Sequence, residues 1–263
     1  MSTGNVPTGE MLTYELRDNI AWLGLNRPEK RNAISEALLA AIDTAFRRAS
    51  REARAIIFHG HGPCFCAGLD LAEMRLRSAE EVFHLSRDWH DLFSRIRRGR
   101  VPALAALHGA TVGGGLELAS ACHIRVADAS AFFALPEGTR GIYVGGGASV
   151  HVARLIGAAR MADMMLTGRV LDAAHAERIG LVQYLVPAGE ALAKAGELAA
   201  KVATMAPLTV LAILQALPRI QDMSEEDGLF VESLTAALAQ TGPEAVAMLT
   251  AFVEKRAKKV GEA

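Results

Sequence analysis

The run Gly113-Gly114-Gly115-Leu116-Glu117 places a carboxylate directly after three consecutive glycines, at the start of an apolar stretch that reads as a helix through Cys122. Because glycine has no side chain, such a loop can bring its backbone N–H groups close to a ligand. A second carboxylate, Glu137, closes the apolar, strand-like segment that begins at Ala131. Two acids on adjoining elements can divide the general acid and general base roles that addition of water to an activated double bond requires.

Strand-like and helix-like segments alternate on both sides of this run. The pattern of residues 12–25 predicts a β-hairpin at the edge of a sheet, turning at Arg17-Asp18-Asn19, and Ser35 is expected to cap an amphipathic helix. Further strands are predicted at 55–59, 102–107, 124–127 and 131–135, and further helices at 80–98 and from Leu116. This alternation predicts an α/β fold in which loops at one end of the sheet build a site.

From about Gly145 the pattern becomes mainly helical. We therefore divide the chain into a flexible N-terminal leader (1–10), a core (11–189) and a helical C-terminal region (190–263). The C-terminal region is rich in alanine and leucine, so its helices are expected either to pack against another subunit or to cap their own chain. The sequence leaves these two alternatives open.

The composition gives no general attraction to charged partners. The chain has 263 residues, 51% of them hydrophobic, and a formal net charge of −1. We therefore expect no binding to nucleic acid or to a membrane surface, and no apolar run has the length of a transmembrane helix. The three cysteines, Cys64, Cys66 and Cys122, cannot form a disulfide framework, so we expect a reducing compartment and infer the cytoplasm.

Each candidate site feature has an ordinary explanation when it is taken alone. The segment from Phe65 to Asp70 could be a plain connecting loop, and the glycine triplet lacks the residues of a phosphate-binding or dinucleotide-binding loop. Glu117 could be a first-turn helix acid and Glu137 a solvated loop acid. If both loops face one cleft, however, one N–H from each could bind a developing oxyanion. No histidine pair has metal-ligand spacing on a helix face, so no metal site is predicted.

Six segments, taken in order, resemble the crotonase superfamily and specifically its enoyl-CoA hydratases. They are NRPEKRNA (26–33), FCAGLDL (65–71), HGATVGGGLELA (108–119), LPE (135–137), LTG (166–168) and AFVEKR (251–256). The resemblance covers nearly the whole chain after residue 11. It implies a spiral of ββα turns followed by a helical region that drives trimer formation, with trimers commonly stacked into hexamers.

The resemblance also implies roles for individual residues. The N–H groups of Leu69 and Gly114 match the family's oxyanion hole, which would hold the thioester oxygen of an acyl-CoA. Glu117 would orient and deprotonate the attacking water, and Glu137 would deliver or remove the proton at the α-carbon. Coenzyme A is part of the substrate, so no separate cofactor is expected. Its contacts are expected from Lys30, Arg31, Ala33, Ala67, Asp70, Leu71 and Ala72.

The activity implied by the resemblance is reversible hydration of a trans-2-enoyl-CoA, a reaction of fatty acid β-oxidation. Double-bond isomerisation and cleavage of a hydroxyacyl-CoA stay open, because the same oxyanion hole serves these reactions. A non-catalytic acyl-CoA-binding protein is a third alternative. Retention of both glutamates favours hydration.

Two departures from the family pattern lie near the expected site. Residues 142–149 read IYVGGGAS where many hydratases have a run that contains proline, and Tyr143 is expected to reshape the acyl pocket. His123 stands where the family often has aspartate, and we expect its role to be structural. The pocket lining is expected from Met74 to Val82 and from the C-terminal helices, and the acyl chain length is left open.

Overall fold

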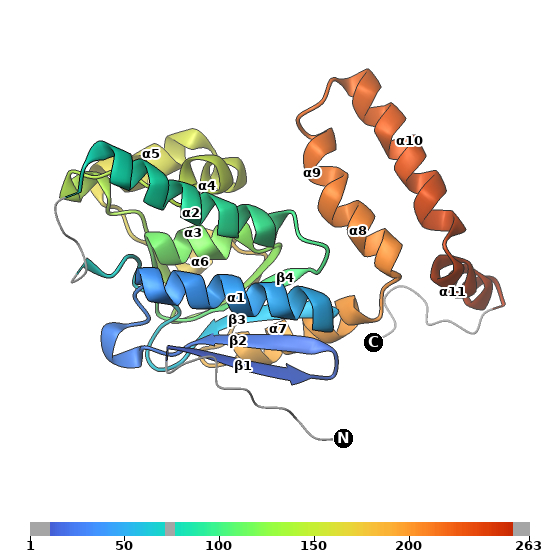
Figure 1. The fold of residues 1–263 in the computed structure, drawn as a ribbon, viewed down its shortest axis with the longest axis horizontal. Coiled ribbons are helices and arrows are strands. Elements are labelled where there is room, and N and C mark those ends of the chain that lie inside the picture. Colours follow the sequence, from blue (N-terminus) through green and yellow to red (C-terminus); the bar gives the residue numbers. More distant parts are fainter. Residues whose placement is uncertain (1–10, 72–76, 255–263) are drawn as a thin grey trace. The chain divides into compact units, whose positions relative to one another are not determined.

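The fold is built around a six-stranded sheet in the order β1-β2-β3-β4-β6-β9. Figure 1 labels the first four of these strands. The computed structural model describes residues 11–71 and 77–254. β1 pairs with β2 in antiparallel orientation, and all later neighbours in this sheet are parallel. The strands are Leu12–Arg17 (β1), Ile20–Leu25 (β2), Ala55–Gly60 (β3), Ala103–Leu107 (β4), Ile124–Asp128 (β6) and Tyr184–Val186 (β9).

A second sheet has the order β5-β7-β8 and is made of Ala110–Val112, Phe132–Ala134 and Leu171–Asp172. The consecutive strands β4 and β5 belong to different sheets, as do β6 and β7, and a helix follows each pair along the chain. This repeated strand–strand–helix unit confirms the predicted α/β fold with a ββα core. The sequence did not predict β5 or β8, because strands of two or three residues are too short to show alternation.

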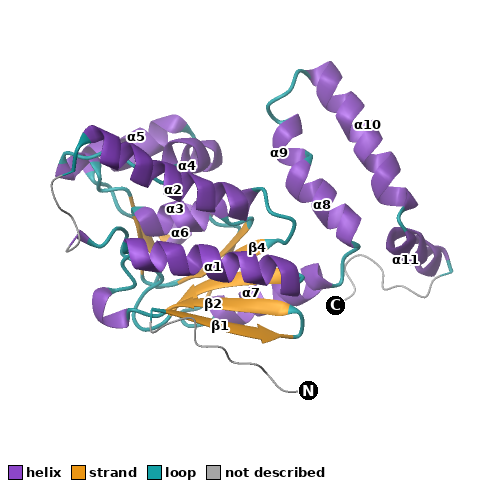
Figure 2. Cartoon of the chain, viewed as in Figure 1, coloured by secondary structure: helices purple, strands orange, loops and turns teal. Residues whose placement is uncertain are grey.

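Helices connect the strands and make up most of the C-terminal part of the chain, as Figure 2 shows. Ser35 caps α1 as predicted, since its side chain accepts a hydrogen bond from the N–H of Leu38. The predicted hairpin turn is also confirmed: Asp18 and Asn19 have φ angles of 52° and 62°, which suit the twist of the flanking strands. The helices are Glu36–Glu52 (α1), Ala79–Arg97 (α2), Gly114–Ala121 (α3), Ala148–Ile156 (α4), Ala158–Thr167 (α5), Ala173–Arg178 (α6), Ala191–Ala203 (α7), Pro207–Gln215 (α8), Leu217–Ile220 (α9), Glu225–Thr241 (α10) and Pro243–Val253 (α11), with 3-10 turns at Pro28–Lys30 and Gly138–Arg140.

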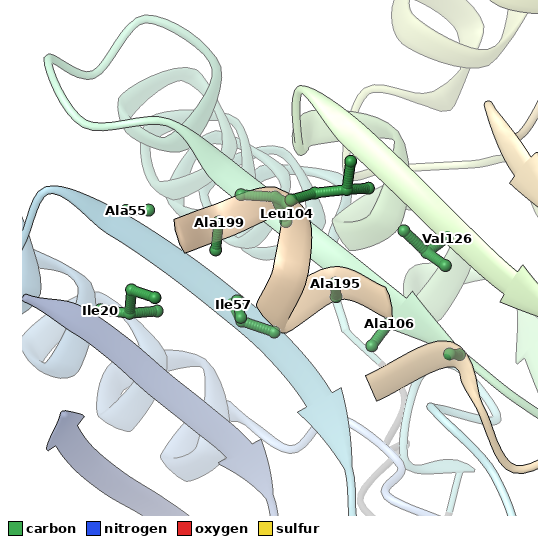
Figure 3. Packing of buried hydrophobic residues seen from close by; sticks show 10 residues of the cluster. Ile20, Ala55, Ile57, Leu104, Ala106, Val126, Ala195 and Ala199 are labelled. Carbon is green, nitrogen blue, oxygen red and sulfur yellow. The ribbon is translucent and has the colours of Figure 1, made fainter. Parts of the chain in front are cut away.

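Successive strand residues point to opposite sides of the large sheet. Both faces are buried, because helices pack on each of them. On one face, Phe58 of β3 stacks on Phe46 of α1, with ring centroids 6.4 Å apart. On the other face, α7 supplies small side chains to an apolar cluster (Figure 3). Alanines such as Ala195 and Ala199 let this helix lie close to the sheet, and its partners are Ile20, Ala55, Ile57, Leu104, Ala106 and Val126.

The chain divides into two compact units. One contains the described residues through Arg97 and from Pro102 through Ala203, and the other contains Arg98–Val101 and the described residues from Thr204 onward. The sequence predicted a boundary after residue 189, whereas the first unit ends at Ala203. The residues between these two boundaries include the whole of α7. The difference arises because α7 contacts β3, β4 and β6, so it belongs with the sheet. A helical pattern alone does not show which element a helix covers.

The C-terminal unit carries many exposed apolar side chains. Within this unit α10 contacts α8, α9 and α11. On α10 and α11 the exposed apolar residues are Leu229, Phe230, Leu234, Leu238, Val246, Met248, Leu249, Phe252 and Val253. In the part of the chain that the structure describes, no single helix is long and apolar enough to cross a membrane, although Ala191–Ala203 and Pro207–Ile220 pass that test when taken together.

His123 has the structural role expected of it. Its Nδ1 accepts a hydrogen bond of 3.0 Å from the N–H of Ala103, and its Nε2 lies 3.0 Å from the carbonyl oxygen of Arg97. Burial lowers the pKa of His123 from 6.5 to about 4. The neutral ring therefore joins the start of β4 to the end of α2.

We expect His123→Gln to destabilise the protein most above pH 6.5 and progressively less toward pH 4. The unfolded chain binds a proton at His123 as the pH falls below 6.5, whereas the folded chain binds it only near pH 4. Wild type therefore loses the contribution of this histidine across that window, about 3 kcal/mol. Urea unfolding of both proteins from pH 4 to 8 measures the difference. A pH-independent difference would contradict this assignment.

Candidate active site

The amides of Leu69 and Gly114 lie side by side because the loop after β3 runs along β5. The N–H of Cys66 donates to the carbonyl of Ala110 at 2.9 Å, and the N–H of Val112 donates to the carbonyl of Cys66 at 3.0 Å. A methyl group placed on Gly114 would lie only 3.6 Å from the Leu69 nitrogen. In the described part of the chain, neither of these two N–H groups has a hydrogen-bond acceptor. Two free and adjacent amides can bind one anionic oxygen.

Gly68 allows this approach, since it adopts a φ of +103° that favours glycine. A Cβ atom at this position would lie 2.9 Å from the carbonyl oxygen of Val112. Gly113 has a φ of +52° and begins the turn into α3. The two glycine loops predicted from the sequence are therefore brought together.

Glu117 is buried at the first turn of α3, with 4% of its surface exposed. Its Oε1 accepts hydrogen bonds from the N–H of Gly146 at 2.8 Å and from the N–H of Ala148 at 3.1 Å. Burial raises the pKa of Glu117 to about 7, the two N–H bonds oppose this rise, and the nearby Glu137 adds to it. A carboxyl group with such a pKa can accept or release a proton near neutral pH.

Glu137 faces the same space from the end of the segment after β7. A Cβ atom on Gly113 would lie 2.6 Å from Oε1 of Glu137, so this acid lies directly over the glycine loop. Its Oε2 is buried and has no hydrogen-bond partner among the described residues. Burial raises the pKa of Glu137, and the nearby Arg140 opposes the rise. An unpartnered, buried carboxyl oxygen is costly unless a ligand uses it.

Both carboxylates and both amides line one cavity of about 370 Å³. Trp89 of α2 forms part of its wall and meets Phe93 edge-on, with ring centroids 5.5 Å apart. The remaining lining residues are Glu36, Asp70, Arg77, Val82, Leu85, Ser86, Ile142, Tyr143, Val144, Gly145 and Gly146. The cavity thus combines an apolar wall with a polar end where two acids and two free N–H groups converge.

The comparison with known proteins decides the family. The sequence model described as enoyl-CoA hydratase/isomerase matches residues 15–262. This chain belongs to the enoyl-CoA hydratase/isomerase family.

Similar proteins agree with this assignment. The crystal structure of a provisionally named enoyl-CoA hydratase from Rhodopseudomonas palustris has 50% identity and a TM-score of 0.91, and the match covers 97% of this chain and 98% of that one. "Probable enoyl-CoA hydratase 2, mitochondrial" from Arabidopsis thaliana is 35% identical over 89% of this chain and 79% of its own length. An enoyl-CoA isomerase/hydratase from Mycosarcoma maydis is 33% identical over 89% of both chains. The resemblance to the crotonase superfamily is confirmed, and the protein is an enzyme of the enoyl-CoA hydratase kind.

Only some of the residues expected to contact coenzyme A line the cavity of this enzyme. Asp70 lines it, and its Oδ2 accepts a hydrogen bond of 2.8 Å from Arg27, which orders the loop. Lys30 and Arg31 are exposed on the 3-10 turn and do not line the cavity. Ala33, Ala67 and Leu71 also lie outside the lining, Leu71 with 47% of its surface exposed. Ala72 falls outside the described residues, as does Met74 of the predicted pocket lining.

Gly146 and Ala148 are the functional residues that the sequence analysis missed. Their N–H groups hold the carboxylate of Glu117, although they lie 29 and 31 residues from it in the chain. The second glycine triplet, Gly145-Gly146-Gly147, is the signal that could have indicated another backbone contact site.

A second cavity, of about 280 Å³, lies beside the carboxyl ends of β3, β4 and β6. Its one carboxylate, Asp128, already accepts hydrogen bonds from the N–H and hydroxyl of Ser130 and from the N–H of Gly189. Its oxygens therefore serve the local turns. Among the described residues, no group of three or more His, Cys, Asp or Glu side chains is placed to hold a metal ion.

Proposed function

We propose that this enzyme catalyses the reversible hydration of a trans-2-enoyl-CoA at the first cavity. The observation that carries the proposal is the convergence of Glu117, Glu137 and the free N–H groups of Leu69 and Gly114 on one cavity. These groups supply a base, an acid and an oxyanion site, which conjugate addition of water requires. The only coenzyme in this reaction is the coenzyme A of the substrate.

In this mechanism the thioester oxygen accepts hydrogen bonds from Leu69 and Gly114. Glu117, held ionised by the N–H groups of Gly146 and Ala148, removes a proton from water as the water oxygen bonds to the β-carbon. The electrons of the double bond move toward the thioester, and the developing enolate oxygen is stabilised by the two amides. Glu137 then donates its proton to the α-carbon, which restores the carbonyl.

The two acids have different surroundings, which supports this division of roles. Two N–H groups hold one oxygen of Glu117, and such bonds favour the ionised form of a carboxyl group. Glu137 has a buried oxygen without a partner, a setting that favours the protonated form. Repulsion between the carboxylates further disfavours ionisation of both at once.

Enoyl-CoA isomerisation is the alternative reaction. Glu137 lies where it could move a proton between two carbons, and one relative is named for both activities. Isomerisation adds no atoms to the substrate, so the two reactions give products of different mass. Retention of both carboxylates in one cavity favours hydration, because isomerisation needs no base for water.

The proposal is tested by incubating the enzyme with a panel of enoyl-CoA thioesters that have short, long and aryl acyl groups. Loss of the enoyl thioester absorbance, together with a product that gains the mass of one water, is the expected result. A product of unchanged mass with a shifted double bond would assign isomerisation instead. The absence of turnover across the whole panel would contradict the hydratase assignment.

We also propose that the enzyme is a homotrimer or a hexamer built from two trimers. The exposed apolar side chains of α10 and α11 support this proposal, because soluble monomers rarely expose so many. Light scattering at micromolar concentration is expected to give three or six times the chain mass. Substitution of Leu234 and Leu238 by glutamate is expected to lower that mass, and a monomeric wild type would contradict the proposal.

A further inference from the structure

Ser86 of α2 connects this helix to the loop that holds Glu117. Its hydroxyl donates a hydrogen bond of 2.6 Å to the carbonyl oxygen of Gly145. The next residue, Gly146, donates its N–H to Oε1 of Glu117 at 2.8 Å. One side chain on α2 is therefore linked through a single peptide unit to the carboxylate on α3.

The loop around Gly146 needs such a link. Three consecutive glycines have the greatest backbone freedom, and Gly147 enters α4 with a φ of +104° and no side-chain cap. The backbone bonds from Val150 and His151 fix the carbonyl of Gly147. On the preceding side, the hydroxyl of Ser86 is the group that binds the carbonyl of Gly145.

The fit between the loop and Glu117 is also tight. A Cβ atom on Gly146 would lie 2.8 Å from Oε2 of Glu117 and 3.0 Å from the ring of Phe93. The loop therefore packs directly against the carboxyl group. A small displacement of Gly146 would lengthen the bond that favours the ionised form.

We propose that Ser86 is a positioning residue for Glu117, which it controls by fixing the Gly145–Gly147 loop. This inference rests on the proposed role of Glu117 as the base that activates water. Without the Ser86 hydroxyl, the N–H groups of Gly146 and Ala148 are held less firmly at the carboxylate. The ionised form of Glu117 then loses stabilisation, and more alkaline solution is needed to ionise it.

Other titratable groups surround Glu117, and they are the same in wild type and variant. Glu137 faces it across the cavity, and its charge raises the pKa of Glu117. On α2, the Nε2 of His90 lies 3.5 Å from the Ser86 hydroxyl, and His151 of α4 packs beside Gly147. Further groups are Cys66, which packs against Gly115, and the cavity-lining Glu36, Asp70, Arg77 and Tyr143.

The test is the pH dependence of kcat for two variants. Ser86→Ala removes the hydroxyl group, and Ser86→Thr keeps one. We expect the acidic limb of the Ser86→Ala profile to move to higher pH by about half a unit or more. The rate near pH 7 then falls roughly twofold or more, the rate well below pH 7 falls roughly threefold or more, and the rate at high pH approaches that of wild type. Ser86→Thr is expected to keep the wild-type limb. A role in folding alone would lower the rate equally at every pH.

Ser233→Ala is the matched control. Ser233 is also a helical serine, and among the described residues its hydroxyl donates to a carbonyl of its own helix, that of Leu229. It is expected to leave the profile unchanged. An unmoved acidic limb in a folded Ser86→Ala protein would overturn the inference, as would a Ser86→Thr limb displaced as far as that of Ser86→Ala. Glu117→Gln distinguishes a failure of this inference from a failure of the proposed function. If it abolishes turnover while Ser86→Ala leaves the limb unmoved, only this inference fails, and if it stays active the proposed function fails.

Discussion

Glu117→Gln is expected to lower kcat for hydration by about a thousandfold, the range typical for loss of a general base. Glutamine cannot accept the proton of the attacking water. The N–H groups of Gly146 and Ala148 would still hold its amide oxygen, so the fold and the KM are expected to change little. Steady-state hydration rates with purified variant measure the loss, and thermal unfolding confirms that the protein is folded.

Glu137→Gln is expected to reduce hydration to a similar degree by removing the proton donor for the α-carbon. The two roles can be separated by solvent deuterium exchange at the α-carbon of a saturated acyl-CoA. Glu117→Gln is expected to retain this exchange, because it depends on Glu137 and the two amides. Glu137→Gln is expected to lose it. Exchange that survives in Glu137→Gln and disappears in Glu117→Gln would reverse the two assignments.

The same acids predict the pH dependence of the wild-type enzyme. Burial raises the pKa of Glu117 to about 7, and the base must be ionised, so kcat is expected to fall as the pH decreases through that value. Glu137 is the proton donor and is neutral in the reactive state, and glutamine is neutral as well. The residual activity of Glu137→Gln is therefore expected to keep the acidic limb of the wild type.

Local sequence rules predicted those parts of the fold that depend on neighbouring residues. The Asp18-Asn19 turn and the Ser35 cap involve contacts within a few residues, and both are confirmed. The position of α7 on the sheet depends instead on long-range packing of small side chains such as Ala195, which a helical pattern does not specify. The boundary between the two units could not be predicted for that reason.

The candidate site likewise contains residues that the sequence predicted and residues that it did not. Glu117, Glu137, Leu69 and Gly114 were predicted, and the structure brings all four to one cavity. Their roles in catalysis stay predictions, as do a cytoplasmic location and the absence of a separate cofactor. Gly146 was missed because a backbone N–H that reaches a carboxylate 29 residues away leaves no mark in side-chain chemistry. The side chains of Lys30 and Arg31 are exposed and lie outside the cavity. Their expected contacts with coenzyme A stay predictions.

Gly114→Ala is expected to lower kcat by about a hundredfold or more, the cost typical for loss of one oxyanion donor. The added methyl group would lie 2.8 and 2.9 Å from two carbons of the Trp89 ring and 3.6 Å from the Leu69 nitrogen. Trp89 is buried and packs edge-on against Phe93, so it has little room to withdraw. Gly114 must therefore shift away from Trp89, which moves its N–H out of line with that of Leu69.

Gly242→Ala provides the control for Gly114→Ala, because its new methyl group would meet other atoms only at ordinary contact distances of 3.6 Å and more. It is expected to keep the wild-type rate. The double variant Gly114→Ala with Trp89→Leu is expected to regain part of the lost kcat, since a smaller side chain relieves the overlap that displaces the amide. A wild-type rate for Gly114→Ala would show that the Gly114 N–H does not hold the thioester oxygen. If the double variant is as slow as Gly114→Ala alone, the methyl group itself occupies the position of that oxygen beside the Leu69 N–H.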